Sequence, residues 1–247
     1  MQGIATDKNI LVFYTNRNTK KKHDATGAFI PEAKSFAKLH GVPKEQLIGM
    51  PLVTMRKKRR RELVLDTIRD RGGAEKLDCV AFFGHGWPRG IQFGFNRKNL
   101  KDLVSVLSWK SRPDLKIILY ACLAAENDVR EWNHKDVGPG TDGGFADLLR
   151  DELVRQNLHR TRVDAHKTKG HTSWNPYCVR FRGESVKSKL YGAVGGSWLV
   201  QPGSELWGEW VEALRYKNSG MRYRFPFMSE LEIKAELAGK DLVDFER

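Results

Sequence analysis

Residues 79–86 of the chain read CVAFFGHG, and residues 115–122 read LKIILYAC. Each stretch is a continuous apolar run that ends in small residues and one reactive side chain. Such runs are typical of strands that are covered on both faces, as in a parallel sheet. The intervening residues 97–107 have a helical pattern, so the order strand, helix, strand predicts a right-handed crossover between parallel neighbours. The sequence therefore predicts an α/β fold with a mainly parallel central sheet.

The other apolar and amphipathic stretches complete this pattern. Short apolar runs predict strands at residues 9–15, 47–54 and 162–166. Apolar residues at helical spacing predict helices at residues 31–40, 61–71, 145–157 and 229–239. A chain of 247 residues suits one large α/β domain with a small addition. We expect a main domain over residues 1–195 and a C-terminal extension, residues 196–247, packed on or beside it.

The composition is that of a soluble globular protein with an excess of basic residues. Of the 247 residues, 40% are hydrophobic and 30% are charged, and the formal net charge is +13. No apolar run approaches the ~18 residues that a membrane-spanning helix needs, and the first residues lack the pattern of a secretory signal. Three scattered cysteines are too few for a disulfide framework or a zinc cluster. The sequence thus predicts a cytoplasmic protein without a membrane segment, a metal or a cofactor.

The densest positive charge is the run Arg56–Arg61, which reads RKKRRR. Three roles remain open for this run: a solvated loop that leads into a helix, a contact with an acidic partner, and a protease-sensitive processing site. Aromatic residues do not interleave with it, and the sequence has no Gly-rich phosphate-binding loop. The sequence therefore argues against a nucleic-acid partner and leaves an acidic protein partner open.

Both central apolar runs lead directly into residues that can carry chemistry. Gly84, His85 and Gly86 follow the first run, and Cys122 ends the second. Because the carboxyl ends of parallel strands meet at one edge of a sheet, His85 and Cys122 should lie side by side there. A cysteine thiolate is a strong nucleophile, and a neighbouring imidazole accepts its proton or stabilises it as an ion pair. The backbone N–H groups of Gly86 and Cys122 would then stabilise the oxyanion of an acyl-transfer intermediate.

This order of motifs resembles the caspase-like cysteine peptidases, which include caspases, metacaspases, legumain, separase, clostripain-type enzymes and bacterial CHAT-domain proteases. The matching positions are residues 80–86, VAFFGHG, and residues 117–122, IILYAC. The resemblance covers about residues 9–182, and the CHAT-domain and clostripain-type members are the most similar in pattern. It implies a three-layer sandwich in which helices flank the mainly parallel central sheet.

The resemblance also implies roles for single residues. His85 would be the catalytic histidine, Cys122 the nucleophile, and Gly86 an oxyanion donor beside the Cys122 N–H. The chain would then be a cysteine endopeptidase that hydrolyses peptide bonds in a protein substrate. Caspases proper carry Gln-Ala-Cys followed by a small or polar residue and Gly, whereas residues 120–124 read YACLA. This departure argues against a true caspase and against a preference for aspartate.

The substrate pocket is expected near the two strand ends and in the loop at residues 167–177. Five residues are candidates for this pocket: Trp87, Glu126, Asp128, Asp142 and Lys167. Trp87 is either a wall of the cleft or a packing residue of its own loop. The acidic candidates favour a basic residue before the cut, whereas Lys167 favours an acidic one, and both preferences remain open. Asp142 fits a helix N-cap equally well.

Two other interpretations of the chain remain open. The first is a catalytically silent, caspase-like scaffold that binds partners, although the presence of both His85 and Cys122 disfavours it. The second is a basic nucleic-acid-binding α/β protein in which the pairing of these two residues is a coincidence. The positive charge fits this second interpretation, but the missing nucleic-acid motifs do not.

The other cysteines and two later histidines are assigned plainer roles. Cys79 and Cys178 fit small buried hydrophobic residues, which is the usual state of a free cysteine. His166 and His171 flank a loop that follows an expected strand. We expect both histidines at the surface or in contact with substrate.

Overall fold

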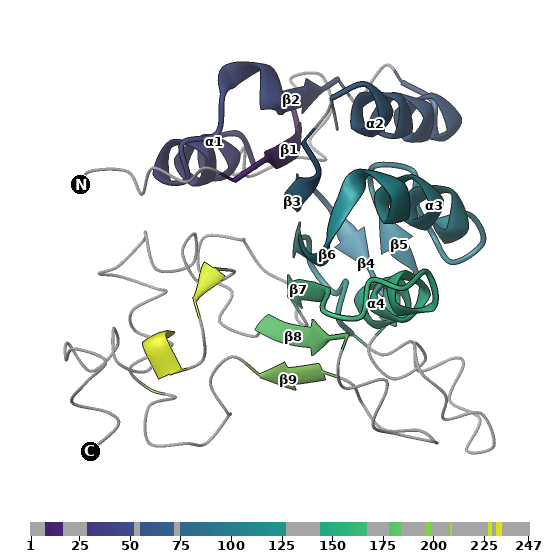
Figure 1. Cartoon of the computed structure of the whole chain (residues 1–247). Coiled ribbons are helices and arrows are strands. Elements are labelled where there is room, and N and C mark those ends of the chain that lie inside the picture. The colour runs from purple at the N-terminus through teal and green to yellow at the C-terminus, as the bar shows by residue number, and fades with distance from the viewer. Residues whose placement is uncertain are drawn as a thin grey trace.

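The computed structural model describes residues 8–16, 29–51, 55–71, 75–126, 144–166, 178–183, 196–198, 208, 227–228 and 231–233. Within them the chain forms an α/β sandwich of three layers, in which a central sheet lies between helices on its two faces (Figure 1). The expected fold class, α/β with a mainly parallel central sheet, is confirmed. No helix in this described part is long and apolar enough to cross a membrane.

The central sheet has seven strands in the order β2-β1-β3-β6-β7-β8-β9. Neighbouring strands from β2 to β7 are parallel, whereas β8 runs antiparallel to β7, and β9 antiparallel to β8. The strands are β1 (Ile10–Thr15), β2 (Leu47–Met50), β3 (Leu77–Phe83), β6 (Ser111–Tyr120), β7 (Arg162–His166), β8 (Cys178–Arg182) and β9 (Gly196–Trp198). The strands β3 and β6 lie inside the parallel part, which explains why their sequences are continuously apolar.

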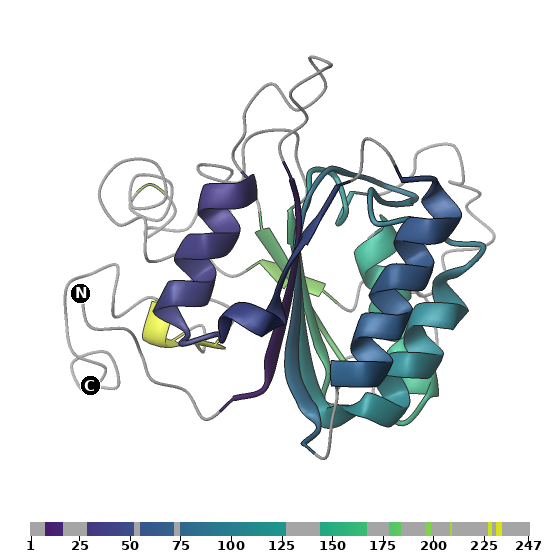
Figure 2. The same ribbon diagram turned by 90° about the horizontal axis from the view of Figure 1, so that it is seen from above.

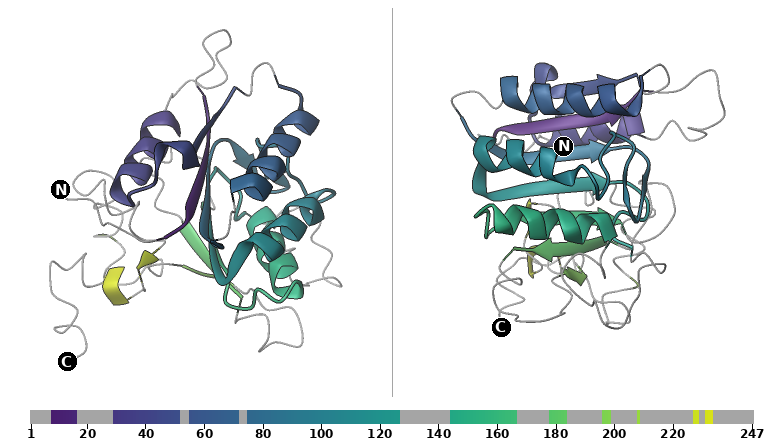
Figure 3. Two further views of the ribbon diagram at one scale, coloured as in Figure 1. Left: turned by 45° about the horizontal axis from the view of Figure 1, so that its top comes forward. Right: turned by 90° about the vertical axis from the view of Figure 1, so that its right-hand side faces the viewer.

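The helices cover the two faces of the sheet unequally. Helix α1 lies on one face, and helices α2, α3 and α4 lie on the other (Figure 2). Seen from the second face, these three helices lie next to one another across the sheet (Figure 3). A small hairpin of two short strands follows β3. The bounds are α1 (Phe29–Leu39), η1 (Lys44–Gln46), α2 (Lys57–Arg71), α3 (Leu100–Lys110), α4 (Gly144–Arg155), and the hairpin strands β4 (Gly86–Trp87) and β5 (Gly90–Ile91).

Side chains of each strand alternate between two apolar cores, one on each face of the sheet. On β3, Val80 and Phe82 pack with α2, α3 and α4, while Phe83 packs on the α1 face. Aromatic rings also stack between neighbouring strands. The ring centroids of Phe13 and Phe82 are 5.3 Å apart, and those of Phe83 and Tyr120 are 4.4 Å apart. These stacked pairs favour one register of β1, β3 and β6.

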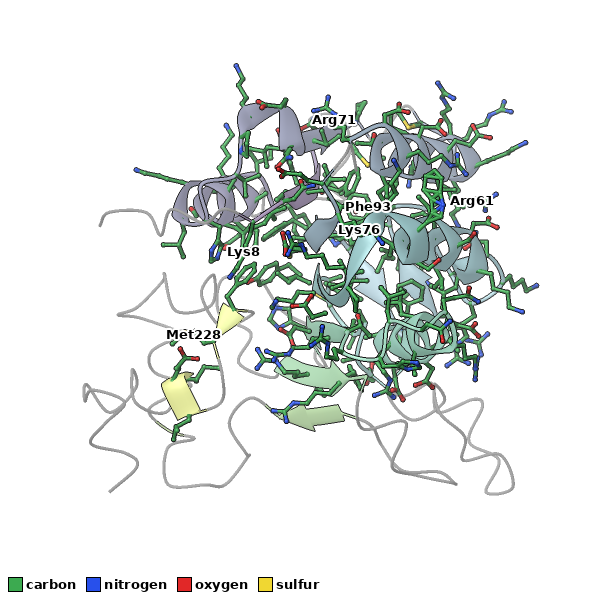
Figure 4. The ribbon with its side chains drawn as sticks, in the orientation of Figure 1. Lys8, Arg61, Arg71, Lys76, Phe93 and Met228 are labelled. Atoms are coloured by element: carbon green, nitrogen blue, oxygen red, sulfur yellow. The ribbon has the colours of Figure 1, made fainter. Side chains whose placement is uncertain are left out.

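Part of the C-terminal extension packs against the α1 face. Ile233 is fully buried there, and the Phe227 ring lies 6.3 Å from that of Phe36 on α1. The carbonyl of Met228, labelled in Figure 4, accepts a hydrogen bond of 3.0 Å from Arg180 Nη1 on β8. The described part of the extension therefore belongs to the same fold, and β9 also extends the central sheet.

Two differences from the sequence-based boundaries are informative. Helix α2 begins at Lys57 rather than at Arg61, so most of the basic run is helical and not a loop. Strand β8 was not predicted, because its sequence CVRFR places the fully buried Arg180 where an apolar residue would signal a strand. The final helix expected at residues 229–239 is helical over residues 231–233, and the rest of it lies outside the described residues.

Candidate active site

His85 lies two residues beyond the end of β3, at the entry to the β4–β5 hairpin. The residue before it is Gly84, and this position has no room for a side chain. A Cβ there would lie 2.8 Å from the Phe93 ring and 2.9 Å from Thr15 Cγ2. Gln92 holds the His85 backbone on both sides. The His85 N–H donates to Gln92 Oε1 at 3.1 Å, and the His85 carbonyl accepts from the Gln92 N–H at 2.9 Å. These bonds fix where the histidine stands at the strand end.

The His85 imidazole packs edge-on against Phe29 of α1, with ring centroids 5.0 Å apart and an interplanar angle of 89°. Its Nε2 is buried and has no hydrogen-bond partner among the described residues. Buried polar atoms without a partner are rare in folded proteins, and each needs an explanation such as a catalytic role. Among the described residues, no hydrogen bond therefore occupies the Nε2 atom.

Cys122 lies two residues beyond the end of the neighbouring strand, β6, as His85 does beyond β3. In the parallel pair of β3 and β6, Phe83 is opposite Tyr120, so His85 and Cys122 each lie two residues beyond a paired position. Neighbouring strands are about 4.8 Å apart, and residues two apart project to the same side. Cys122 is half-buried and is not part of a disulfide. The backbones that carry the two predicted residues thus leave neighbouring strands at the same edge of the sheet.

Gly86 lies directly against the backbone of the candidate nucleophile. A Cβ at Gly86 would lie 2.7 Å from the Ala121 Cβ and 2.9 Å from the Cys122 carbonyl oxygen. Only glycine permits this approach, because distances under about 3 Å to a Cβ or a backbone atom are not tolerated. Two backbone segments that carry the predicted oxyanion donors are therefore in contact.

The turn that follows the thiol is tightly constrained. Leu123 has a φ of +60°, in the left-handed region that residues other than glycine rarely adopt. The Glu126 N–H donates to the Leu123 carbonyl at 3.0 Å, and the Ala125 N–H donates to the His166 carbonyl at 3.0 Å. Gly144, at the start of α4, also has a positive φ, and a Cβ there would collide with the Glu126 carbonyl oxygen. Backbone strain of this kind clusters at functional turns.

His166 is part of this region, and it is buried rather than at the surface, which was one of its two expected positions. It ends β7, and only 3% of it is exposed. Leu119 pairs with Ala165, so the next residues, Tyr120 and His166, are neighbours, and their ring centroids are 5.8 Å apart. Side chains alternate between the two faces along β7, so His166 lies on the same face as the buried Asp164. This alternation could have predicted its burial.

Two of the predicted pocket residues flank the strand ends. Trp87, in β4, is 37% exposed and follows Gly86, while Glu126 is half-buried in the turn after Cys122. The Pro88 carbonyl would lie 3.2 Å from a Cβ at Gly144, the residue that Glu126 contacts, so the hairpin and the turn meet. Three other predicted pocket residues lie outside the described residues: Asp128, Asp142 and Lys167.

Cys79 has the properties expected of a structural thiol. It is fully buried within β3, and burial raises the pKa of its thiol far above the ordinary value. Cys178 begins β8, opposite His166. Among the described residues, no group of three or more His, Cys, Asp or Glu side chains could hold a metal ion. Of the two thiols whose burial the structure describes, Cys122 is the less buried.

Comparison with known proteins found no family model that matches the chain and no curated protein that matches its sequence. The function is therefore inferred from the geometry of the two strand ends.

Proposed function

We propose that the chain is a caspase-like cysteine endopeptidase that hydrolyses peptide bonds in a protein substrate. The observation that carries this proposal is the register of β3 and β6, which pairs the last residues of the two strands, with His85 two residues beyond one and Cys122 two residues beyond the other. A thiol next to an imidazole supplies the nucleophile and the base of acyl transfer. The contact of Gly86 with the Cys122 backbone supports an adjacent oxyanion site.

The proposed reaction passes through a thioester on Cys122. His85 takes the proton from the Cys122 thiol, and the thiolate adds to the scissile carbonyl carbon. The N–H groups of Gly86 and Cys122 donate hydrogen bonds to the resulting oxyanion. As the C–N bond breaks, the imidazolium gives its proton to the leaving amine. His85 then takes a proton from water, and the hydroxide adds to the thioester carbonyl. The C–S bond breaks, the carboxylic acid product leaves, and the imidazolium returns its proton to the Cys122 sulfur.

Substrate choice depends on which charged residue lines the pocket. Glu126, in the turn after the nucleophile, supports a basic residue before the scissile bond, whereas Lys167 would support an acidic one. The net charge of +13 additionally supports weak, salt-sensitive attraction to acidic regions of a substrate. A catalytic thiol fits a reducing, cytoplasmic location.

Labelling with a library of peptide acyloxymethyl ketones tests the nucleophile and the pocket together. The wild-type chain should form a covalent adduct at Cys122, located by mass spectrometry, and the preferred peptide should identify the charge of the pocket. Cys79→Ala is the matched control and should label like the wild type. Labelling that survives Cys122→Ala would refute the assignment of the nucleophile.

A further inference from the structure

Gln92 connects the candidate histidine to a distant part of the chain. Its amide oxygen and its backbone N–H hold the two sides of the His85 backbone. Its own carbonyl accepts a hydrogen bond of 3.3 Å from Arg60 Nη1. A continuous set of hydrogen bonds therefore runs from Arg60, in the basic run, to His85.

Arg60 differs from the basic residues that precede it. Residues 56–59 are exposed, whereas Arg60 is half-buried. Its Nε donates to the Met55 carbonyl at 2.8 Å, while Nη1 reaches the Gln92 carbonyl. Burial lowers the pKa of Arg60 relative to its ordinary value. The guanidinium thus bridges the start of α2 and the loop after β5, with both carbonyls as acceptors.

The same two segments are also in direct backbone contact. Gly94 has a φ of +96°, and a Cβ there would lie 2.5 Å from the Lys57 carbonyl oxygen and 3.3 Å from the Arg61 nitrogen. Arg61, which Figure 4 shows beside α3, pairs with Asp102 of that helix at 3.4 Å. These contacts hold the start of α2 against the loop and against α3. They therefore fix the position of Arg60 relative to Gln92.

We propose that Arg60 and Gln92 are positioning residues for His85, in which Gln92 aligns the backbone of the histidine and Arg60 holds Gln92 in place. This inference rests on the proposed function, because it concerns the base of the proposed dyad. Neither residue acts on the substrate. Together they set where the imidazole stands relative to the Cys122 thiol.

The residues of the basic run thus differ in their surroundings. Arg60 points into the fold, while Arg59 is 67% exposed and pairs with Glu62 at 3.5 Å. Removal of an exposed ion pair of this kind changes the stability of the fold little. Loss of the Gln92 contacts, by contrast, leaves the His85 N–H without its acceptor and frees the turn. A misplacement of about 1 Å at reacting groups lowers turnover by about 10²-fold.

Adjacent arginines provide a matched test of this inference. Arg60→Met and Arg59→Met each remove one positive charge from the same helix. With a small neutral fluorogenic peptide, Arg60→Met should lower kcat by about 10-fold or more, with KM nearly unchanged. Arg59→Met should stay within about twofold of the wild type in both constants. Equal kcat values for the two variants would overturn the proposal.

Gln92 permits a rescue experiment. Gln92→Leu removes the acceptor of the His85 N–H and should lower kcat as much as Arg60→Met does. Gln92→Glu keeps a side-chain oxygen at that position and should restore most of the lost turnover. If Gln92→Leu and Gln92→Glu lose the same activity, the contact with the His85 N–H has no positioning role. Circular dichroism and thermal unfolding establish that each variant is folded.

A readout that does not depend on turnover separates this inference from the proposed function. In the NMR spectrum of histidine-labelled protein, the imidazole signals of His85 are assigned by their loss in His85→Gln. These signals should shift in Arg60→Met and Gln92→Leu but not in Arg59→Met. If the wild type cleaves no peptide, the proposed function fails, and the signals alone decide whether Arg60 and Gln92 position the ring. Unshifted signals in both variants would reject the inference.

Discussion

Cys79 and Cys122 are both cysteines of neighbouring strand segments, but one is fully buried and the other is half-buried. Cys79 lies within β3, fully buried among apolar side chains of the α1 face, where burial raises the pKa of its thiol. Cys122 lies two residues beyond β6, half-buried, with its carbonyl against Gly86. One thiol is therefore held protonated inside the sheet, and the other is less deeply buried, at the end of the strand next to the one that leads into His85.

The difference shows that position along a strand, rather than residue type, decides the chemistry of a cysteine here. Inside a parallel sheet, both faces of a strand are covered, and a thiol behaves as a small apolar group. Just beyond the carboxyl end, the chain leaves the covered region and the side chains of adjacent strands face a common space. Four experiments can break or sharpen this contrast.

Removal of each thiol in turn gives the largest expected contrast. Cys122→Ala should lower cleavage of a fluorogenic peptide by about 10³-fold or more, because the variant lacks the thiol that is proposed to form the acyl-enzyme. Cys79→Ala should keep the activity of the folded protein and lower its stability by about 1–2 kcal/mol, because a buried sulfur leaves a cavity. Turnover and thermal unfolding measure the two effects. A folded Cys122→Ala protein that cleaves at the wild-type rate would show that Cys122 is not the nucleophile.

Removal of the imidazole tests whether Cys122 depends on its neighbour across the strands. His85→Ala should lower turnover by about 10²–10⁴-fold, since both the proton acceptor and the proton donor are lost. The same assay measures this effect, and circular dichroism monitors the fold. His85→Ala with at least half of the wild-type turnover would mean that a different group activates the thiol.

A methyl group at Gly86 tests the oxyanion site beside Cys122. Gly86→Ala places a Cβ against Ala121 and the Cys122 carbonyl, so the two backbones must separate. We expect a loss of about 10²-fold in kcat, comparable to the loss of one oxyanion donor. Gly208→Ala is the matched control, because no atom of the described residues lies within 4 Å of a Cβ there. Equal kinetics for the two alanine variants would contradict a close contact at Gly86.

Alkylation compares the two thiols in one unmodified molecule and gives the smallest expected ratio. At neutral pH, iodoacetamide should modify Cys122 at least about 10-fold faster than Cys79, because access and thiolate fraction set the rate. The raised pKa of Cys79 keeps it protonated until the fold opens. Peptide mapping over time gives both rates, and earlier modification of Cys79 would reverse the assignment.

The central strands and the positions of His85 and Cys122 could be predicted because coverage on both faces leaves an unbroken apolar signal. Strand β8 could not, because Arg180 is buried with Asp164 as its ion-pair partner at 3.0 Å, and the sequence does not show that partner. The start of α2 was missed for a related reason. Four cations at its first turn suggest a solvated loop, whereas the contact with Gly94 is a property of the folded chain.

The residues that hold His85 carried no signal in the sequence. Arg60 and Gln92 are polar residues in a basic run and a short loop, and neither belongs to a repeated pattern. Their roles arise from hydrogen bonds between segments 32 residues apart in the chain. Sequence patterns report burial and periodicity, so they identify the groups that react more readily than the groups that hold them.

The irregular pairing at the start of β3 and β6 has a consequence for how the chain tolerates insertions and deletions. The register shifts between Leu77 and Cys79, whose partners change from Ser111 to Lys116, and the exposed residues 112–114 lie in the interval. A length change within that interval leaves the pairing of Phe83 with Tyr120 intact. A single deletion after Lys116 would instead turn the thiol to the opposite face of the sheet. Homologous chains should therefore vary in length before Lys116 and keep a constant length from there to Cys122.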